Sequence, residues 1–265
     1  MKYVTAAGTD VPALGFGTAR MDTREEQYRA VSTALAAGYR HVDTAQAYGT
    51  ETDVGDAVRD AQVDRDEVFL TTKLSGTNRA YDDVIGSTHA SLDRLDTDYV
   101  DLLLVHAPNE EVPHSETLRA MNDLRDDGYI RHIGVSNFSV EETREAMALS
   151  EAPILTNQVE YHVRKRRDEL LAFCVDEGMM LTAYSPLEVG ALADNDGLEA
   201  IGDRHGKTAS QVAIRWLLQQ PMVSAIPMSS SPEHIRENVG VFDFELTDEE
   251  MHRLFDRGGP LDALR

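Results

Sequence analysis

Four side chains able to hold or donate a proton follow three consecutive apolar segments of this sequence. Asp43 lies in HVDTA, and Tyr48 follows it by five residues. Lys73 lies in VFLTTKL, and His106 ends DLLLVH. An ammonium beside a phenol favours the phenolate, so a tyrosine in that setting can donate a proton to a developing alkoxide near neutral pH. An imidazole can hold the same oxygen by a hydrogen bond. The set therefore predicts a site at which Tyr48 is a general acid.

Each of the four residues also has a commoner structural role. The aspartate could cap a helix, the lysine could be a solvated strand end, the histidine could be a core residue, and the tyrosine could simply pack. Their combination favours chemistry, because Lys73 and Asp43 at apolar strand ends would form a partly buried ion pair. Burying charge is costly, so such a pair is expected to have a use.

A second group of polar residues ends later apolar segments. Ser136 and Asn137 lie in GVSNF, Gln158 in TNQVEY and Tyr184 in AYSPL. Hydroxyl and amide groups suit the edge of a carboxamide, and an aromatic ring suits its face, so the set fits a nicotinamide. The alternatives are that Ser136 and Asn137 cap the next helix and that Gln158 satisfies backbone groups.

Other kinds of catalytic centre have little support in the sequence. The nine histidines are scattered and HExxH is absent, so we predict no metal site. No G-x-S-x-G nucleophile elbow is present. GFGTAR at 15–20 contains G-x-G without the third glycine, which is weak evidence for a Rossmann turn.

Short apolar runs alternate with amphipathic segments along the whole chain. This alternation predicts βαβ units and a parallel sheet, and eight repeats favour a (β/α)8 TIM barrel over a doubly wound sheet. Active sites of such barrels lie at the carboxyl ends of strands about 4.8 Å apart, which would bring the four residues together. KYVTAAGTDVPAL, with a turn at Gly8–Asp10, predicts an N-terminal β-hairpin cap. We expect one domain over 1–265 and strands at LGFG (14–17), HVDTA (41–45), VFLTTKL (68–74), YVDLLLVH (99–106), IRHIGVSN (130–137), ILTNQVEY (154–161), MMLTAYSPL (179–187) and VSAIPM (223–228).

Composition sets limits on partners and location. The formal net charge is −22, from 47 acidic and 25 basic residues, and only four of the latter are lysines. Self-repulsion of this size is relieved by salt, so we expect adaptation to high salt rather than an ordinary acidic surface. Polyanions would be repelled, which predicts no nucleic-acid partner. No apolar run is long enough for a membrane span, and we expect a cytoplasmic monomer or weak oligomer. Cys174, the one cysteine, is expected to be a buried bystander.

Several motifs in order give the chain its strongest resemblance. GFGT, VDTAxxYGTE, VFLTTKL, DLLLVHxP, IGVSNF, NQVEYH, AYSPL and IPxSSSPEHIRENV resemble the aldo-keto reductases over essentially the whole length. Within that family the chain looks like the bacterial or archaeal short-loop members that resemble diketogluconate and methylglyoxal reductases. The resemblance implies a (β/α)8 barrel that reduces a small carbonyl substrate with NADP(H) and/or NAD(H).

The resemblance also implies roles for individual residues. It makes Tyr48 the general acid, Lys73 and Asp43 the pair that tunes it, and His106 the residue that orients the carbonyl. Carboxamide contacts would come from Ser136, Asn137 and Gln158, with Tyr184 stacked on the ring. Ser185 and Leu187 would lie along the pyrophosphate, Ser229 near the ribose phosphate, and Glu237 and Asn238 near the adenine. Further cofactor contacts would be Gly17, Thr18, Asp43, Ile226, Met228 and His234.

Two alanines depart from the family pattern near the substrate. Ala19 and Ala107 stand where an aromatic residue is common. Trp216, the only tryptophan, lies in VAIRWLLQQ, where a helix-core role is expected. The loop after His106 is short. An open pocket with few aromatic walls therefore predicts small or polar carbonyl substrates.

AIPMSSSPEHIRENV (225–239) is expected to be a helix N-terminus that could receive an anion. Met228 and His234 stand where NADPH-preferring relatives usually have lysine and arginine, which grip the phosphate on the ribose. We therefore predict use of NADH as well as NADPH, with only weak NADPH preference. The alternative is that other groups fill the gap and NADPH dominates.

Two other functions remain as alternatives. A nicotinamide-binding barrel could be a regulatory or sensor protein without catalysis. A barrel hydrolase or isomerase could use Asp43 and His106. The enzyme is favoured because all four catalytic positions are filled, and a hydrolase gives no reason for Tyr184 or for Ser136 and Asn137.

Overall fold

A closed ring of eight parallel strands forms the centre of the protein. The computed structural model describes residues 1–109 and 111–255, so the predicted domain over 1–265 includes residues outside the described part. Strands β3 to β10 stand in chain order, and Leu14 pairs with Ala225 to join the two edges. The order never reverses, so the barrel is confirmed and the doubly wound sheet was the wrong alternative. The strands are β3 (Phe16–Gly17), β4 (His41–Asp43), β5 (Phe69–Leu74), β6 (Val100–Val105), β7 (Ile130–Ser136), β8 (Ile154–Glu160), β9 (Met180–Tyr184) and β10 (Val223–Ala225).

All eight predicted strands are present, but several end earlier than expected. The run 179–187 is extended only to Tyr184, because Ser185 has a φ of 49° and turns the chain away from the barrel. The run 223–228 pairs with β9 only to Ala225. Leu187 and Met228, which follow the two ladders, are apolar because they pack against the main core.

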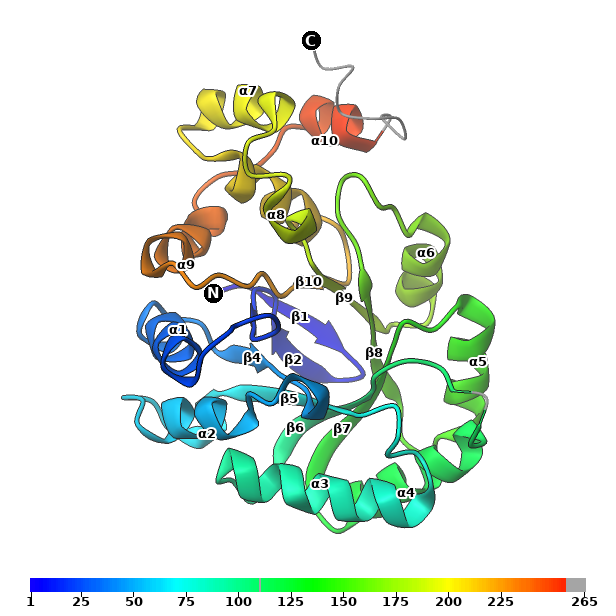
Figure 1. Ribbon diagram of the computed structural model, residues 1–265. Coiled ribbons are helices and arrows are strands. Elements are labelled where there is room, and N and C mark those ends of the chain that lie inside the picture. Colours follow the sequence, from blue (N-terminus) through cyan, green and yellow to red (C-terminus); the bar gives the residue numbers. More distant parts are fainter. Residues whose placement is uncertain (110, 256–265) are drawn as a thin grey trace.

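Helices surround the strands on the outside (Figure 1). Local signals start several of them: Thr23 caps α1, while Ser139 with Glu142 and Thr208 with Gln211 form capping boxes on α5 and α8. The helices that alternate with strands are α1 (Arg24–Ala36), α2 (Glu51–Arg59), α3 (Tyr81–Leu95), α4 (His114–Asp126), α5 (Val140–Leu149), α6 (Asp168–Asp176), α8 (Ala209–Leu218) and α9 (Pro232–Val239). α7 (Asp196–His205) and α10 (Asp248–Phe255) are additional. No described helix has the length and apolar character needed to span a membrane.

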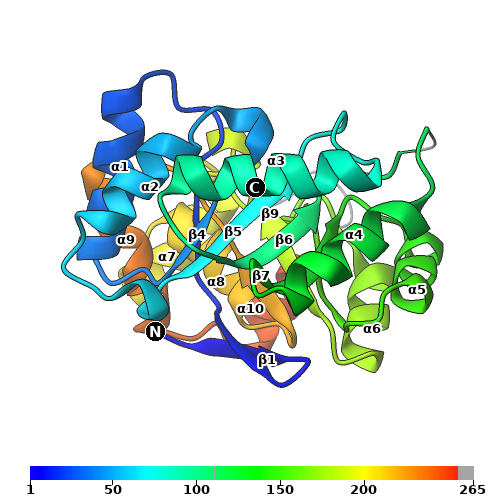
Figure 2. The ribbon, with the colours of Figure 1, turned by 90° about the horizontal axis from the view of Figure 1, so that it is seen from below.

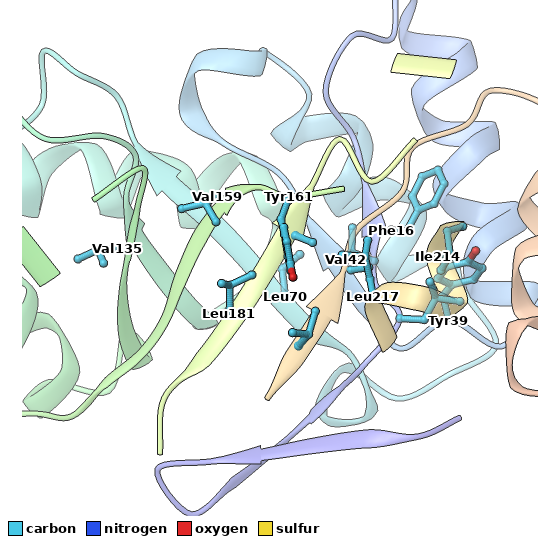
Figure 3. Close-up of a cluster of buried hydrophobic side chains, with 14 of the residues drawn as sticks. Phe16, Tyr39, Val42, Leu70, Val135, Val159, Tyr161, Leu181, Ile214 and Leu217 are labelled. Carbon is cyan, nitrogen blue, oxygen red and sulfur yellow. The ribbon is translucent and has the colours of Figure 1, made fainter. Parts of the chain in front are cut away.

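The main core lies between the strands and these helices (Figure 3). Val42 and Leu70 from the strands, and Ile214 and Leu217 from α8, are fully or almost fully buried. Trp216 is also buried on α8, which confirms its helix-core role. Cys174 is buried as predicted, and this burial raises the pKa of its thiol to about 12, so it is unreactive near neutral pH.

The N-terminal hairpin closes one end of the barrel (Figure 2). Its strands β1 (Tyr3–Ala6) and β2 (Thr9–Pro12) are antiparallel. The turn lies at Ala7–Gly8, where both residues have positive φ, rather than at the predicted Gly8–Asp10. Hairpin residues pack on barrel-strand residues, most of which lie in the first half of their strands; this cluster contains Ala6, Val11, Phe69, Leu102, Leu104, Leu155 and Met180. The predicted cap is therefore confirmed, and the carboxyl ends of the strands are left for a site.

Candidate active site

The carboxyl ends of β4, β5 and β6 bring the predicted catalytic residues together. Asp43 is the last residue of β4 and Lys73 the next-to-last of β5, while His106 follows β6 directly. Tyr48 is the last residue of a short 3₁₀ helix, Gln46–Tyr48, which lies in the loop after β4. Gly49 follows in the left-handed region at φ 70°, which turns the chain into α2. The turn places the tyrosine next to the two strand ends.

A buried ion pair lies at the centre of the site. Nζ of Lys73 contacts Oδ1 of Asp43 and donates to the main-chain oxygen of Thr44 at 2.8 Å. Nε2 of Gln158 donates to the other carboxylate oxygen of Asp43 at 2.7 Å. Burial alone would lower the pKa of Lys73, but Asp43 and Tyr48 outweigh it and the pKa is raised. The lysine is therefore a fixed positive charge at physiological pH.

The hydroxyl of Tyr48 lies within reach of this charge. Its oxygen is 3.5 Å from Nζ of Lys73, and the ammonium lies 5.0 Å from the centre of its ring. The rings of Tyr48 and His106 meet edge to face, with 5.7 Å between centroids. Tyr48 is only partly buried, whereas Lys73 and Asp43 are each 1 % exposed. The phenol thus stands between the buried charge and the open end of the barrel.

His106 is held in its neutral form. Burial, followed by the charge of Lys73 and then that of Arg79, lowers the pKa of its imidazole to about 4, against the opposing effect of Asp43. One ring nitrogen of a neutral imidazole carries a proton and can donate it in a hydrogen bond. His106 can therefore bind a carbonyl oxygen without adding another charge.

The predicted nicotinamide residues form a connected network beside these groups. Oγ of Ser136 donates to the main-chain oxygen of Gln158 at 2.7 Å. The amide nitrogen of Asn137 donates to the main-chain oxygen of His106 at 3.0 Å, and its amide oxygen accepts from the hydroxyl of Tyr184 at 2.9 Å. Asn137 has a φ of 62°, and Ser139 is the N-cap of α5. The capping role considered for Ser136 and Asn137 was therefore wrong.

The loop after β9 carries the residues expected along the pyrophosphate. Ser185, Glu188 and Val189 all have positive φ, and Glu188 is paired with Arg164 at 2.7 Å. Leu187 packs against the main core, while Ser185 accepts the backbone N–H of Glu188 at 2.9 Å through its own main-chain oxygen. The loop is a sharply turned segment directly beyond Tyr184.

Gly17 and its neighbours lie on the other side of the barrel opening. A Cβ on Gly17 would come within 2.9 Å of the main-chain oxygen of Ile226, so a glycine is needed for this close approach. Thr18 is fully buried, and its hydroxyl lies 3.2 Å from both the main-chain oxygen of Asp43 and the hydroxyl of Thr50. The N–H of Thr18 also donates to the main-chain oxygen of Asp43 at 3.0 Å, so both its hydroxyl and its N–H are engaged within the protein.

The segment that leads into α9 has the expected helix start. Ser231 is the N-cap, and its oxygen accepts from the N–H of His234 at 3.4 Å. Oγ of Ser229 accepts from the N–H of Ser231 at 3.1 Å. His234 is exposed, whereas Met228 packs against the core. Arg236 donates to the main-chain oxygen of Pro232, at the first turn of the same helix, at 3.2 Å.

The two predicted adenine residues differ in their surroundings. Asn238 is buried, 4 % exposed, on the side of α9 that packs toward the barrel. Glu237 is only partly buried, and its main-chain oxygen accepts from Gln211 at 2.7 Å. The structure thus leaves the side chain of Glu237 better placed than that of Asn238 to meet a ligand.

Sequence reasoning missed two polar groups that support the site. Glu51, the first residue of α2, is 1 % exposed. Its carboxylate accepts a hydrogen bond from Oγ1 of Thr72 at 2.6 Å and pairs with Arg94 of α3. Arg79 is buried and donates to the main-chain oxygen of Ala107 at 3.0 Å. The motif YGTE marks Glu51, but no pattern around Arg79 indicates burial. Among the described residues, no group of three or more His, Cys, Asp or Glu is arranged to hold a metal ion.

Comparison with known proteins shows the family of the chain. The model of the aldo/keto reductase family matches residues 13–256. The chain belongs to the aldo/keto reductase family. It is therefore an oxidoreductase, and its barrel is the family's fold.

Individual aldo/keto reductases are similar to it over nearly the whole chain. Glyoxal reductase from Bacillus subtilis (strain 168) is 38% identical over 247 residues, which are 93% of this chain and 89% of that protein. A crystal structure of a putative 2,5-diketo-D-gluconic acid reductase B is 45% identical, with a TM-score of 0.95 over 98% of this chain and 92% of the other. The aldo-keto reductase of Bombyx mori in complex with NADP is 30% identical, with a TM-score of 0.89 over 98% of this chain and 94% of the other.

Proposed function

We propose that this protein reduces small or polar aldehydes and ketones to alcohols with NADPH or NADH, with Tyr48 as the general acid. The observation that carries the proposal is the phenol oxygen 3.5 Å from a buried lysine that is itself paired with Asp43. The B. subtilis relative is named as a glyoxal reductase and the solved one as a putative diketogluconic acid reductase, and both names describe reduction of small polar carbonyls.

Each of the four proposed catalytic residues has a separate role in the reduction. When bound, the reduced nicotinamide supplies a hydride to the carbonyl carbon. Neutral His106 donates a hydrogen bond to the carbonyl oxygen and orients it. Tyr48 gives its proton to the same oxygen as negative charge develops there, and Lys73 stabilises the phenolate that remains. Asp43, fixed by Gln158, keeps Lys73 in place.

The donor set at the barrel opening fits a nicotinamide cofactor. Asn137 has an exposed amide side chain, and its hydrogen bond to Tyr184 fixes both groups before any ligand binds. In this proposal Ser136, Asn137 and Gln158 hold the carboxamide, and the ring of Tyr184 supports the nicotinamide. The loop after Tyr184 and the segment 226–238 hold the phosphates and the adenosine.

Met228 and His234 argue for use of both cofactors. Hydrogen bonds to charged groups contribute about 1.5–3 kcal/mol each, so two missing cations could remove two to four decades of preference for NADPH. Hydrogen bonds from the hydroxyls of Ser229, Ser230 and Ser231 to the phosphate would restore part of the preference for NADPH. Arg236 does not replace the missing pair, because its guanidinium lies back along its own helix. We expect a weak preference between the two cofactors.

Steady-state kinetics test the proposal directly. Oxidation of NADPH and of NADH is followed at pH 7.5 in high salt with methylglyoxal, glyoxal, a keto-sugar and a steroid ketone. We expect reduction of the small polar compounds, with higher kcat/KM for methylglyoxal than for the steroid. No reduction of any small carbonyl compound would contradict the function, and an NADPH preference above about 100-fold would contradict the dual use.

A further inference from the structure

Arg79 is a buried cation without an acidic partner among the described residues. It lies in the loop between β5 and α3 and is 2 % exposed. Its Nη2 donates to the main-chain oxygen of Ala107 at 3.0 Å, but its Nε and Nη1 have no hydrogen-bond partner. Burial lowers the pKa of its guanidinium to about 10, so it remains charged near neutral pH.

A second buried arginine shows how unusual this arrangement is. Arg215, on α8, is 1 % exposed. It pairs with Glu245 at 3.1 Å and donates to the side chain of Gln219 at 2.9 Å. Its positive charge is thus compensated by a carboxylate. Removal of an unpaired charge from water is costly, and a neutral side chain could make the single bond to Ala107. The charge of Arg79 therefore needs a reason of its own.

The position of Arg79 next to the segment that carries His106 gives a reason for its charge. The carbonyl that it binds belongs to the residue directly after His106, and its guanidinium charge acts on that imidazole. Its own main-chain oxygen accepts from Oγ1 of Thr117, on α4, at 2.6 Å. Both the side chain and the backbone of Arg79 are therefore fixed against the segment that carries His106.

We propose that Arg79 is a positioning residue for His106: its bond to Ala107 fixes the backbone directly after the histidine, and its unpaired positive charge disfavours a second positive charge on the imidazole. A neutral imidazole can present one N–H to the carbonyl oxygen of the substrate. This inference rests on the role proposed above for His106.

The charged groups around His106 determine the sign of the expected effect. Lys73 faces it from β5, Asp43 from β4, Tyr48 from the turn after β4, and Arg79 from the loop before α3. Burial has the largest effect and lowers the pKa of His106; Lys73 and Arg79 lower it further, and Asp43 raises it. Removal of the positive charge of Arg79 must therefore raise the pKa of His106.

Two substitutions separate charge from hydrogen bonding. Arg79→Gln removes the charge and retains an N–H donor for the oxygen of Ala107, whereas Arg79→Lys retains the charge. NMR titration of the histidine ring protons in the full chain without cofactor gives the midpoint of His106, which is assigned from its absence in His106→Gln. We expect Arg79→Gln to raise this midpoint by about half a pH unit or more, which is about threefold in proton affinity. Arg79→Lys should stay near the wild-type value.

Arg215→Met is the matched control, because it removes a buried arginine far along the chain. We expect it to lower the melting temperature and to leave the midpoint of His106 unchanged. If Arg79→Gln does not fold, Arg79→Met provides the neutral variant. In the reductase assay, the neutral variant should lose kcat/KM at higher pH than the wild type, mainly below about pH 5, as protonated His106 accumulates.

Two results would overturn the inference. An unchanged midpoint in the neutral variant would show that the charge does not act on His106. Equal shifts in the glutamine and lysine variants would show that packing, not charge, sets the midpoint. Because the titration needs neither cofactor nor substrate, its failure is distinct from failure of the proposed function, which an absence of carbonyl reduction by the wild type would show.

Discussion

The carboxyl ends of β4–β6, where we propose the catalytic residues, and the start of α9 hold polar groups in opposite ways. At the strand ends, Lys73 and Asp43 are buried, and each has several fixed partners. At the start of α9, hydroxyls and an imidazole are partly or fully exposed, and Arg236 of the same helix donates to the main-chain oxygen of Pro232. Buried charges tolerate few substitutions, whereas exposed groups can be exchanged at small cost. Chemistry should therefore be rigidly specified in this protein, and the choice of cofactor should be adjustable.

The largest expected effect comes from Lys73→Met. The substitution removes the charge that stabilises the phenolate and leaves Asp43 unpaired in a buried position. Breaking a buried pair in this way typically costs about 3–5 kcal/mol of stability, in addition to a loss of at least about 10² in kcat. Activity assays and thermal melts measure both quantities. An unchanged pH–rate profile would show that Lys73 does not act on Tyr48.

Tyr48→Phe should abolish most catalysis while the fold is retained. Loss of a general acid costs about 10²–10⁴ in rate, and the phenyl ring still fills the space beside His106. Cofactor binding, measured by calorimetry, should remain near the wild-type value and is the control. Retention of more than about a tenth of kcat would remove Tyr48 from its assigned role.

The double variant Met228→Lys/His234→Arg should change only cofactor choice. We expect the ratio of kcat/KM for NADPH over NADH to rise by about 10–100-fold, because each added cation can bind the ribose phosphate. Arg236→Gln is the matched control and should leave the ratio unchanged. If the double variant also leaves it unchanged, the start of α9 does not hold that phosphate.

Activity should depend little on pH where an ordinary histidine titrates. The pKa of His106 is lowered to about 4, so the imidazole is neutral from about pH 5 upward and gains its proton only as the pH falls through 4. We therefore expect kcat/KM to change by less than about twofold between pH 5.5 and 7. A clear acidic limb near pH 6.5 would show that His106 is not held neutral.

Salt should produce the smallest and most general effect. A net charge of −22 predicts that the melting temperature rises by several degrees from 0.1 to 2 M KCl, since about 1 kcal/mol corresponds to about 2–4 °C in a chain of this size. A flat melting curve over this range would argue against adaptation to high salt.

The strand ends could be predicted from the sequence because of their topology. In a parallel barrel all carboxyl ends face one way, so Asp43, Lys73 and His106 had to be neighbours once the alternation was recognised. The support of this site could not be predicted in the same way. Burial of Arg79 depends on the packing of the loops after β5 and β6, and the left-handed backbone of Asn137 depends on its side-chain contacts with β9 and His106.

Small errors in the prediction also have physical causes. The hairpin turn falls at Ala7–Gly8 because Asp10 is needed in the ladder opposite Thr5. The capping role considered for Ser136 was wrong because Ser139 and Glu142 form a better cap three residues later. In both cases the sequence offers two neighbouring positions for the turn or the cap, and the backbone geometry of the folded chain selects between them.

If the proposed cofactor contacts are right, a bound cofactor would stabilise the join between the two edges of the barrel, near β3 and β10. The two edges are held by bonds such as Gly15 N to Ala225 O at 2.9 Å and Gly17 N to Pro227 O at 3.1 Å. The proposed cofactor contacts lie on both sides of this seam, at Gly17 and Thr18 and at Ile226 to Ser229. A dinucleotide that binds residues on both sides of this seam would hold the two edges of the barrel together. Hydrogen exchange at Gly15 and Gly17 should then slow when the cofactor binds, even though neither amide belongs to the chemistry.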